Sequence, residues 1–262
     1  MARRTIKDAR AIVTGASSGI GREIALELSR QGARLVVLAR REEKLQRLAE
    51  EIRGRGGEAA IVAGDVTDPA VRAAAIETAR RVYGGLDILI NNAGVGALGK
   101  FSDANPQRLR RIMEVNFFST AEMIRAALPS LREGNRPIVV NISSVLGHRG
   151  VPLSSEYCAS KFAVQGLSES LRAEFSREGI DLLVVSPSTT ESEFFQSVIE
   201  QTEHVDRTTR RTTPAATVAK KTVRAIARGK HEIVISFLGW LLTWGNRQNP
   251  RLLDYLLAKY GQ

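Results

Sequence analysis

Cysteine is nearly absent from the chain, with Cys158 the only one among 262 residues. A single cysteine excludes both an intrachain disulfide and a cysteine-cluster metal site. The three histidines, His148, His204 and His231, lack the close spacing of metal ligands. We therefore expect no metal site, and the scarcity of cysteine fits a reducing, cytoplasmic setting.

Long apolar runs, repeats and Ser/Gly-rich linkers are also missing. The uncharged stretch 233–244 is shorter than the roughly 20 residues that a bilayer-spanning helix needs. The basic segment 1–10 lacks the apolar centre of a signal peptide. With no boundary visible, the sequence predicts one domain over residues 1–262, long enough to bury roughly 70–75% of its unfolded surface.

Acidic residues are outnumbered by basic ones. Lys and Arg total 38 and Asp and Glu total 28, so the net charge is 38 − 28 = +10. Such an excess could attract nucleic acid, anionic lipid or an anionic cofactor. The basic residues are scattered and form no run interleaved with aromatics. This pattern favours a solvated basic surface, and we expect no nucleic acid partner.

Short β-rich runs alternate with helical patterns along the chain, which is typical of a parallel sheet covered by helices. The sequence predicts one doubly wound α/β domain of the Rossmann type, with a parallel seven-stranded sheet. The expected strands are 10–14, 34–39, 59–63, 87–90, 137–142, 181–185 and, more weakly, 232–235. The expected helices are 19–31, 42–53, 69–83, 106–132, 154–177 and 214–228.

A glycine-rich turn follows the first expected strand. Residues 14–21 read Thr-Gly-Ala-Ser-Ser-Gly-Ile-Gly and lead into a helical pattern. Glycine lets a backbone turn sharply and approach a pyrophosphate, and a helix N-terminus offers free N–H groups and a positive dipole end. The position between strand and helix favours a dinucleotide site over a merely structural turn. The predicted cofactor contacts here are Gly15, Ser17, Ser18, Gly19, Ile20 and Gly21.

The end of the second strand indicates which dinucleotide binds. An acidic residue there would bind the ribose 2′-hydroxyl of NAD, but this chain has Ala39 followed by Arg40 and Arg41. Two guanidinium groups suit the 2′-phosphate of NADP, although they could also simply face solvent. After the third strand, we expect Asp65 to accept a hydrogen bond from the adenine amino group and Val66 to contact the cofactor. We expect Asp68, which precedes a proline, to cap a helix.

Tyr157 and Lys161 carry the predicted acid–base chemistry. Their i,i+4 spacing places both on one face of a helix. A free tyrosine titrates near pH ~10, and a nearby ammonium group favours the phenolate. Taken alone, such a pair is usually structural. However, Ser144 follows a strand whose end lies at the carboxyl edge of the sheet, so its hydroxyl can meet Tyr157 across a substrate oxygen.

These motifs together resemble those of the short-chain dehydrogenase/reductase family, over roughly residues 9–194. The matching features are the turn at 14–21, Asn-Asn-Ala-Gly at 91–94, Asn116, Ser144, and Tyr157 with Lys161. Thirteen residues separate Ser144 from Tyr157, and 28 separate Asn116 from Ser144, as in the family.

The resemblance implies a role for each matching residue. Tyr157 would be the general acid and base, and Ser144 would hold the substrate oxygen. Lys161 would lower the Tyr157 pKa and bind ribose, and Asn116 would position a water that links Lys161 to solvent. Arg40 would read the 2′-phosphate and Asn91 would support the central sheet. Further implied cofactor contacts are Asn92, Ala93, Gly94, Tyr157, Lys161, Pro187 and Ser192.

The chain departs from the family after the sixth strand. Ser188 stands where the family commonly has glycine after Pro187, and Ser192 stands where threonine is common. Ser192 keeps a hydroxyl for the cofactor, whereas Ser188 restricts a backbone position at which glycine is permissive. The departure concerns the geometry of the loop rather than the class of reaction.

Two C-terminal segments bear on the substrate. By position, about 195–213 is the family's variable lid, and about 236–262 is an apolar extension. The extension allows three interpretations: a last strand plus a flap that lines an apolar pocket, a peripheral contact with a membrane interface, or a subunit contact. All three favour a lipophilic substrate or partner. His148 and Arg149 could face the substrate, but a surface-loop role is the favoured interpretation.

The sequence therefore predicts an NADP(H)-dependent oxidoreductase that interconverts a ketone and a secondary alcohol. The resemblance also implies a homodimer or homotetramer. The alternative from another class is a catalytically silent, NADP-binding regulatory or scaffold protein.

Overall fold

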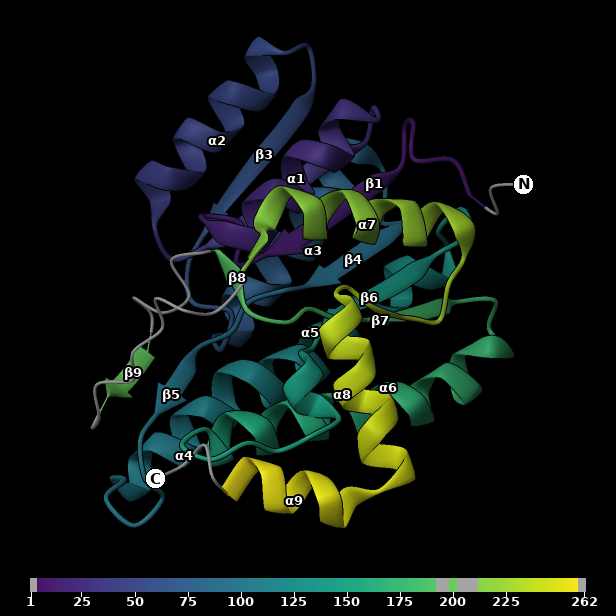
Figure 1. Ribbon diagram of the computed structural model, residues 1–262. Coiled ribbons are helices and arrows are strands. Elements are labelled where there is room, and N and C mark those ends of the chain that lie inside the picture. Colours follow the sequence, from purple (N-terminus) through teal and green to yellow (C-terminus); the bar gives the residue numbers. More distant parts are fainter. Residues whose placement is uncertain (1–3, 192–197, 202–211, 259–262) are drawn as a thin grey trace.

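The computed structural model describes residues 4–191, 198–201 and 212–258 (Figure 1). Seven strands form one parallel sheet in the order β11-β7-β6-β4-β1-β2-β3. The order reverses at β1, which lies between β2 and β4 and so opens a crevice at its carboxyl end. The strands are β1 (Arg10–Thr14), β2 (Arg34–Ala39), β3 (Glu58–Ala63), β4 (Ile88–Asn91), β6 (Ile138–Ile142), β7 (Asp181–Ser186) and β11 (Glu232–Val234).

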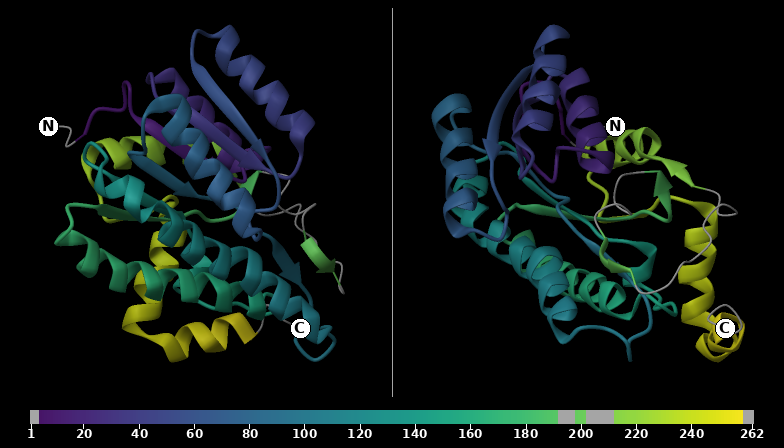
Figure 2. Two further views of the ribbon diagram at one scale, coloured as in Figure 1. Left: turned by 180° about the vertical axis from the view of Figure 1, so that it is seen from behind. Right: turned by 90° about the vertical axis from the view of Figure 1, so that its left-hand side faces the viewer.

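Helices cover both faces of this sheet (Figure 2). Side chains of α1, α2 and α7 join the core cluster on one face, and side chains of α3, α5 and α6 join the cluster on the other. The predicted doubly wound Rossmann-type sheet is thereby confirmed. The helices are α1 (Gly19–Arg30), α2 (Glu42–Gly54), α3 (Pro69–Tyr83), α4 (Pro106–Met113), α5 (Ser119–Arg132), α6 (Ser155–Ser176), α7 (Ala215–Arg228), α8 (Phe237–Gln248) and α9 (Pro250–Ala258).

The middle positions of the strands are mostly apolar because both faces of the sheet are covered. Side chains alternate between the faces of a strand. Ala11 and Val13 of β1 accordingly enter one core cluster and Ile12 enters the other. The alternation continues in β2, where Leu35 and Val36 point to opposite sides. This rigid, doubly covered sheet fixes the strand ends from which the functional side chains project.

The expected continuous helix over 106–132 is wrong in one respect. A π-helical segment, Glu114–Phe118, separates α4 from α5. Single π-turns within helices often occur at functional sites because they redirect a side chain. Here the segment carries Asn116, which is 1% exposed and points into the protein. Periodicity alone does not reveal such an insertion.

The last strand expected before the C-terminal extension is present as β11, and the extension itself is helical. After β11 the chain forms two helices, α8 and α9. The N-cap of α8 is Ser236, whose hydroxyl accepts a hydrogen bond from Gly239 N at 3.0 Å. In the described part of the chain, none of the helices combines the length and apolar character needed to cross a bilayer.

Two short strand pairs complete the fold: β8 (Thr190–Glu191) with β10 (Thr213–Pro214), and β5 (Gly96–Leu98) with β9 (Val198–Gln201).

Candidate active site

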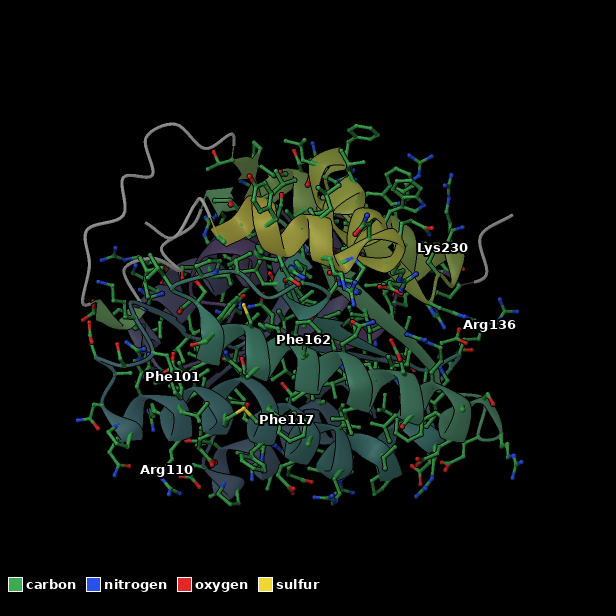
Figure 3. All side chains as sticks on the ribbon, turned by 60° about the horizontal axis from the view of Figure 1, so that its bottom comes forward. Phe101, Arg110, Phe117, Arg136, Phe162 and Lys230 are labelled. Carbon is green, nitrogen blue, oxygen red and sulfur yellow. The ribbon has the colours of Figure 1, made fainter. Side chains whose placement is uncertain are left out.

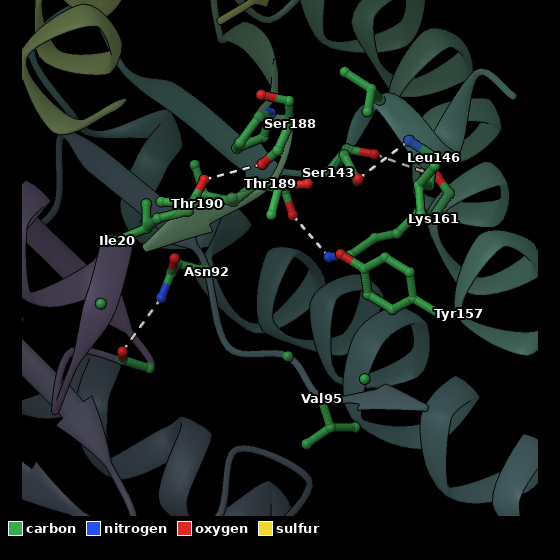
Figure 4. Close-up of a pocket in the computed structure, with 18 of the residues that line it drawn as sticks. Ile20, Asn92, Val95, Ser143, Leu146, Tyr157, Lys161, Ser188, Thr189 and Thr190 are labelled. Atoms are coloured by element: carbon green, nitrogen blue, oxygen red, sulfur yellow. Dashed lines mark hydrogen bonds between the residues drawn. The ribbon is translucent and has the colours of Figure 1, made fainter. Parts of the chain in front are cut away.

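A cavity of about 1250 Å³ opens at the carboxyl edge of the sheet (Figure 4). Most of the residues predicted for the site line it, although they come from many separate segments of the chain. Gly21 and Asn116 lie behind the lining, and Ser192 falls outside the described residues. The predicted residues in the lining are Gly15, Ser17, Ser18, Gly19, Ile20, Arg40, Arg41, Asp65, Val66, Asn92, Ala93, Gly94, Ser144, Tyr157, Lys161 and Pro187.

The glycine-rich turn is packed too tightly for side chains. Gly15 has φ +65°, and a Cβ added there would lie 2.9 Å from the Ala93 Cα. A Cβ at Gly21 would lie 2.5 Å from the Gly15 carbonyl oxygen. These contacts hold the turn between β1 and α1 against the segment that follows β4. A bulkier residue at Gly15 or Gly21 would push the turn into the cavity.

The N-terminus of α1 is suited to an anion. Ser18 is the N-cap, and its side chain makes no capping hydrogen bond. The first-turn N–H groups of a helix have no partner within the helix, and Gly19 and Ile20 both line the cavity. Free N–H groups and the positive end of the helix dipole therefore face the cavity. The turn thus fits the pyrophosphate of a dinucleotide.

Thr14 and Asn92 join the ends of β1 and β4. The glycine-rich motif by itself predicts no separate role for Thr14. The Thr14 hydroxyl accepts hydrogen bonds from Asn92 N at 2.9 Å and Ala93 N at 3.1 Å. In return, Asn92 Nδ2 donates to the Thr14 carbonyl at 3.0 Å. The Asn91 amide donates to Asn141 Oδ1 at 2.9 Å, which supports the predicted role of Asn91 in the sheet.

Arg40 and Arg41 follow β2 and line the same cavity. The Arg41 guanidinium donates to the Ser17 hydroxyl at 2.9 Å and to the Ser18 hydroxyl at 2.6 Å. Arg41 thus reaches across to the glycine-rich turn, while Arg40 is exposed at the rim. Two cations beside the turn create a positive region at this end of the cavity.

Asp65 and Asp68, which close the loop after β3, take different roles. Asp68 caps α3 by accepting a hydrogen bond from Ala70 N at 2.8 Å, as predicted. Asp65 Oδ1 accepts hydrogen bonds from the Thr67 N–H and hydroxyl. Burial raises the pKa of Asp65, but these bonds and the nearby Arg111 outweigh burial and lower its pKa below the usual value. Asp65 is therefore a carboxylate in the cavity lining.

Tyr157 and Lys161 project from α6 into the cavity (Figure 4). Ser144, which follows β6, also lines the cavity. Lys161 Nζ lies 5.7 Å from the centroid of the Tyr157 ring and donates to the Ile142 carbonyl at 2.9 Å. The Ser144 hydroxyl accepts a hydrogen bond from Leu146 N at 3.1 Å, which fixes its position. The three predicted acid–base residues are thus brought together.

Burial controls the proton affinities of this group. It raises the pKa of Tyr157 well above that of a free phenol, and a hydrogen bond with Ser144 lowers it only in part. Burial also lowers the pKa of Lys161 to about 8. The expected lowering of the Tyr157 pKa by Lys161 is therefore not the dominant effect in this state. Tyr157 holds its proton at neutral pH, as a general acid must.

Asn116 lies directly behind these residues. Its Oδ1 accepts from Val95 N at 2.8 Å, and its Nδ2 donates to the Val95 carbonyl at 3.0 Å and to the Ser160 hydroxyl at 2.9 Å. Ser160 in turn donates to the Tyr157 carbonyl at 2.8 Å. Asn116 therefore ties α6 to the loop after β4, and the water relay implied by the family resemblance stays a prediction.

Sequence reasoning missed a buried ion pair beside Tyr157. Arg108 of α4 donates to both carboxylate oxygens of Glu156, each at 2.9 Å. The two side chains are 0% and 3% exposed. Arginine on an apparently polar helix face and glutamate at a helix start both look like surface residues, so only the packing of α4 on α6 reveals the pair.

His148 and Arg149 do not belong to the cavity lining. His148 Nε2 lies 3.0 Å from the Ser186 hydroxyl and 3.2 Å from Glu232 Oε1. Arg149 donates to Asn246 and Asp254, and Asn246 Nδ2 donates back to the His148 carbonyl at 3.0 Å. These residues fasten the loop after Ser144 to the C-terminal helices.

Ser188 adapts to the position where the family commonly has glycine. It is not among the described residues with a left-handed backbone, so it carries no strain there. Its carbonyl accepts a hydrogen bond from the Thr190 hydroxyl at 3.0 Å. Ser192 and most of the predicted lid lie outside the described residues.

The far end of the cavity is apolar, and most of these residues were not predicted. Leu153 adopts φ +64°, which is unusual for leucine and points to a constrained, functional loop. The sequence signal for this apolar wall is that several apolar residues follow the ends of the strands. This wall contains Val95, Ala97, Leu98, Val145, Leu146, Val151, Leu153, Leu238, Leu242 and Leu257.

Fold and site together define a dinucleotide-binding α/β protein, and comparison with known proteins specifies it further. The model of the short chain dehydrogenase family matches residues 9–203. The chain is 32% identical over 239 residues to dehydrogenase/reductase SDR family member 7B of Mus musculus, which covers 88% of this chain and 74% of the relative. An uncharacterized oxidoreductase of Staphylococcus epidermidis is 30% identical over 226 residues, 86% of this chain and 94% of the relative.

Solved structures agree with this assignment. A short chain dehydrogenase/reductase from Burkholderia phymatum in complex with NAD has a TM-score of 0.87 at 24% identity, over 95% of this chain and 96% of that one. A short chain dehydrogenase from Burkholderia cenocepacia in complex with NADP has a TM-score of 0.79 at 25% identity, over 89% and 98%. The chain belongs to the short-chain dehydrogenase/reductase family of oxidoreductases.

Proposed function

We propose that this protein is an NADP(H)-dependent oxidoreductase that interconverts a ketone and a secondary alcohol, with Tyr157 as its acid–base residue. The observation that carries the proposal is the meeting of Ser144, Tyr157 and Lys161 at one wall of the cavity whose other end holds the glycine-rich turn. Acid–base and phosphate-binding groups thus share one space of about 1250 Å³.

The roles of the three side chains follow from their chemistry. The Ser144 hydroxyl donates a hydrogen bond to the substrate carbonyl oxygen and holds it beside Tyr157. Tyr157 gives its proton to that oxygen as the carbonyl carbon is reduced, and takes a proton back in the oxidative direction. The Lys161 ammonium stabilises the phenolate that remains. When bound, a nicotinamide cofactor supplies the hydride to the carbonyl carbon or accepts it in reverse.

The cavity residues favour NADP(H) over NAD(H). Arg40 and Arg41 border the cavity where the ribose of the adenosine half would lie, and Ala39 leaves no carboxylate to bind a free 2′-hydroxyl. One similar solved structure binds NAD and another binds NADP, so the preference rests on these arginines. Gly15, Gly19 and Ile20 would hold the pyrophosphate at the α1 N-terminus.

The substrate we propose is lipophilic. The end of the cavity beyond Tyr157 is lined by Leu98, Leu146, Leu153 and Leu242. An apolar wall binds an apolar substrate by removing both surfaces from water. We also propose a homo-oligomer, as the family resemblance implies.

Tyr157→Phe tests the reaction. With NADPH and a panel of aryl alkyl ketones and long-chain 2-alkanones, the variant should lose about 10²–10⁴-fold in kcat, because only the proton donor is removed. NADPH binding, measured by fluorescence titration, should stay within a factor of about two. Tyr83→Phe is the control, since the Tyr83 hydroxyl bonds the Leu35 carbonyl far from the cavity.

The alternative, a catalytically silent NADP-binding protein, makes the opposite prediction. It requires that no ketone in the panel is reduced by the wild type, that NADPH still binds, and that Tyr157→Phe leaves cellular function unchanged. That combination would overturn the oxidoreductase proposal.

A further inference from the structure

The two C-terminal helices each expose several large apolar side chains. On α8 these are Phe237, Trp240, Leu241 and Trp244, and on α9 they are Leu252, Tyr255 and Leu256; we call this set the apolar plate. Phe237 is 73% exposed and Tyr255 61%. Figures 1 and 2 show both helices at the outer edge of the molecule, and Figure 3 shows them on the side opposite Arg110 and Phe117.

The side chains of the apolar plate do not pack into the hydrophobic core. The inward side of α8 carries Gly239 and Thr243, which are buried, and Gly239 packs against Val145. The large side chains point away from that contact at i, i+3, i+4 and i+7 spacing. Phe237 stacks on Trp240 with ring centroids 5.9 Å apart, and Trp240 stacks on Trp244 at 6.1 Å. An exposed apolar patch of this kind marks an interaction surface.

The charges around the plate are cationic. Within 236–258 the charged residues are Arg247, Arg251 and Asp254. Asp254 is already neutralised by Arg149 at 2.5 Å, which leaves Arg247 and Arg251 exposed at the turn between the helices. At the start of α8, the Lys221 ammonium donates to the Ile235 carbonyl at 2.8 Å. An apolar surface with a cationic rim complements an anionic one.

The plate is continuous with the cavity. Phe237 belongs both to the plate and to the cavity lining, and Leu238, Leu242 and Leu257 of the same two helices line the cavity as well. Leu238 is 65% exposed, so the apolar wall extends from the interior to the outer surface. Whatever covers the plate therefore sits at the mouth of the cavity.

We infer that the apolar plate docks onto the surface of an anionic lipid bilayer, which opens the cavity towards the membrane. Tryptophan suits the interface because its ring is apolar and its N–H is polar. Exposed arginines beside the plate would meet anionic headgroups. A second copy fits less well, because a contact between two plates would bring four exposed arginines together, and the one acidic residue of 236–258, Asp254, already pairs with Arg149. The lipophilic substrate that this docking would supply rests on the proposed function.

The position of the two tryptophans gives a direct test. Trp240 and Trp244 are the only tryptophans in the chain, so its intrinsic fluorescence reports on the plate. The full chain is mixed with vesicles of phosphatidylcholine, either pure or with 30% phosphatidylserine. We expect a blue shift and co-sedimentation with the anionic vesicles only, with binding reduced at least ten-fold when salt is raised from 0.05 to 0.5 M.

Two variants separate the apolar and the cationic contributions. Leu241→Glu with Leu256→Glu should lower vesicle binding at least ten-fold, and Arg247→Gln with Arg251→Gln should lower it at least three-fold on anionic vesicles. The matched controls are Val82→Glu with Phe101→Glu, both exposed elsewhere, and Arg110→Gln with Arg177→Gln. The controls should bind as the wild type does.

Three outcomes would overturn the inference. They are wild type that binds no vesicles, binding that is equal on neutral and anionic vesicles, and a Leu241→Glu, Leu256→Glu variant that binds vesicles normally but changes from oligomer to monomer in light scattering. Vesicle binding needs no substrate, so it can fail while ketone reduction succeeds. Reduction of a water-soluble ketone should be unchanged in this variant, because neither leucine lines the cavity.

Discussion

At the scale of single residues, burial determines how the proposed acid–base group behaves. Tyr157 keeps its proton because burial outweighs the hydrogen bond from Ser144. The same loss of solvent lowers the pKa of Lys161, which is only 5% exposed, to about 8, so its ammonium form still predominates at neutral pH. Burial therefore shifts both pKa values in the direction that favours the neutral form of each group. Such strongly shifted groups in a cavity are typical of functional sites.

This shift makes stability depend on pH through Lys161. Its pKa is about 8 in the folded protein against 10.5 in the unfolded chain. The unfolded state therefore binds more protons between pH 8 and 10.5, and the folded state gains stability as pH rises through that window. Relative to Lys161→Met, the wild type should gain about 2–3 kcal/mol in free energy of unfolding over that range.

Urea unfolding of the two proteins at several pH values measures this gain. Tyr157 has the opposite effect above about pH 10, where a free phenol ionises, but it is present in both proteins and cancels. A difference that stays flat between pH 8 and 10.5 would contradict the burial argument.

At the scale of elements, the position of α6 decides where Tyr157 and Lys161 point. Two contacts hold its start: the Arg108–Glu156 pair to α4, and the hydrogen bond from Asn116 to Ser160. The π-helical turn aims Asn116 at α6. The helices themselves were predictable from their apolar spacing, but the contacts between them were not.

The buried ion pair yields a prediction at this scale. Arg108→Met or Glu156→Leu alone leaves a charge without its partner and should destabilise the protein by about 3–5 kcal/mol. The double variant should recover most of that loss, since two apolar side chains can fill the space. Urea unfolding measures all three.

A surface pair provides the comparison. Arg80 and Glu77 lie 2.9 Å apart at exposed positions, so Arg80→Met should change stability far less than either single variant of the buried pair. For the buried pair, the kcat of each single variant, Arg108→Met or Glu156→Leu, should fall by a larger factor than its KM rises, because Glu156 is adjacent to Tyr157 in α6. Single and double variants that are equally unstable would show that the pair acts only through packing.

At the scale of the whole molecule, the cavity joins the two halves of the sheet. Its lining runs from Gly15 and Arg40 on the β1–β3 side to Tyr157 and Pro187 on the β6–β7 side. A ligand that fills it must therefore stabilise the whole fold. At 100 times its Kd, a ligand adds about 2.7 kcal/mol.

For a protein of this size, that amount corresponds to a rise in Tm of about 5–10 °C. We expect NADPH to raise the Tm in a thermal scan by this amount, and NADH at the same concentration to raise it by clearly less. Arg40→Ala with Arg41→Ala should abolish the difference between the cofactors, whereas Arg110→Ala with Arg177→Ala should retain it. Equal shifts for both cofactors in the wild type would contradict the proposed preference.

The sequence by itself determined the fold class and most of the site. Apolar strands alternating with helices require a covered parallel sheet, and the spacing of Gly15, Ser144, Tyr157 and Lys161 predicted residues that do line one cavity. These signals are local, because each depends on residues close together in the chain.

Only the tertiary structure decided the rest, because it depends on which surfaces meet. Arg108 looked like a surface arginine and is fully buried. The His148 side chain turns towards Ser186 and Glu232, and Arg149 turns towards the C-terminal helices rather than the cavity. The apolar extension became two helices whose outer face stays exposed beside the cavity mouth. Burial, and with it the proton affinity of Tyr157, is set by neighbours that are distant in sequence.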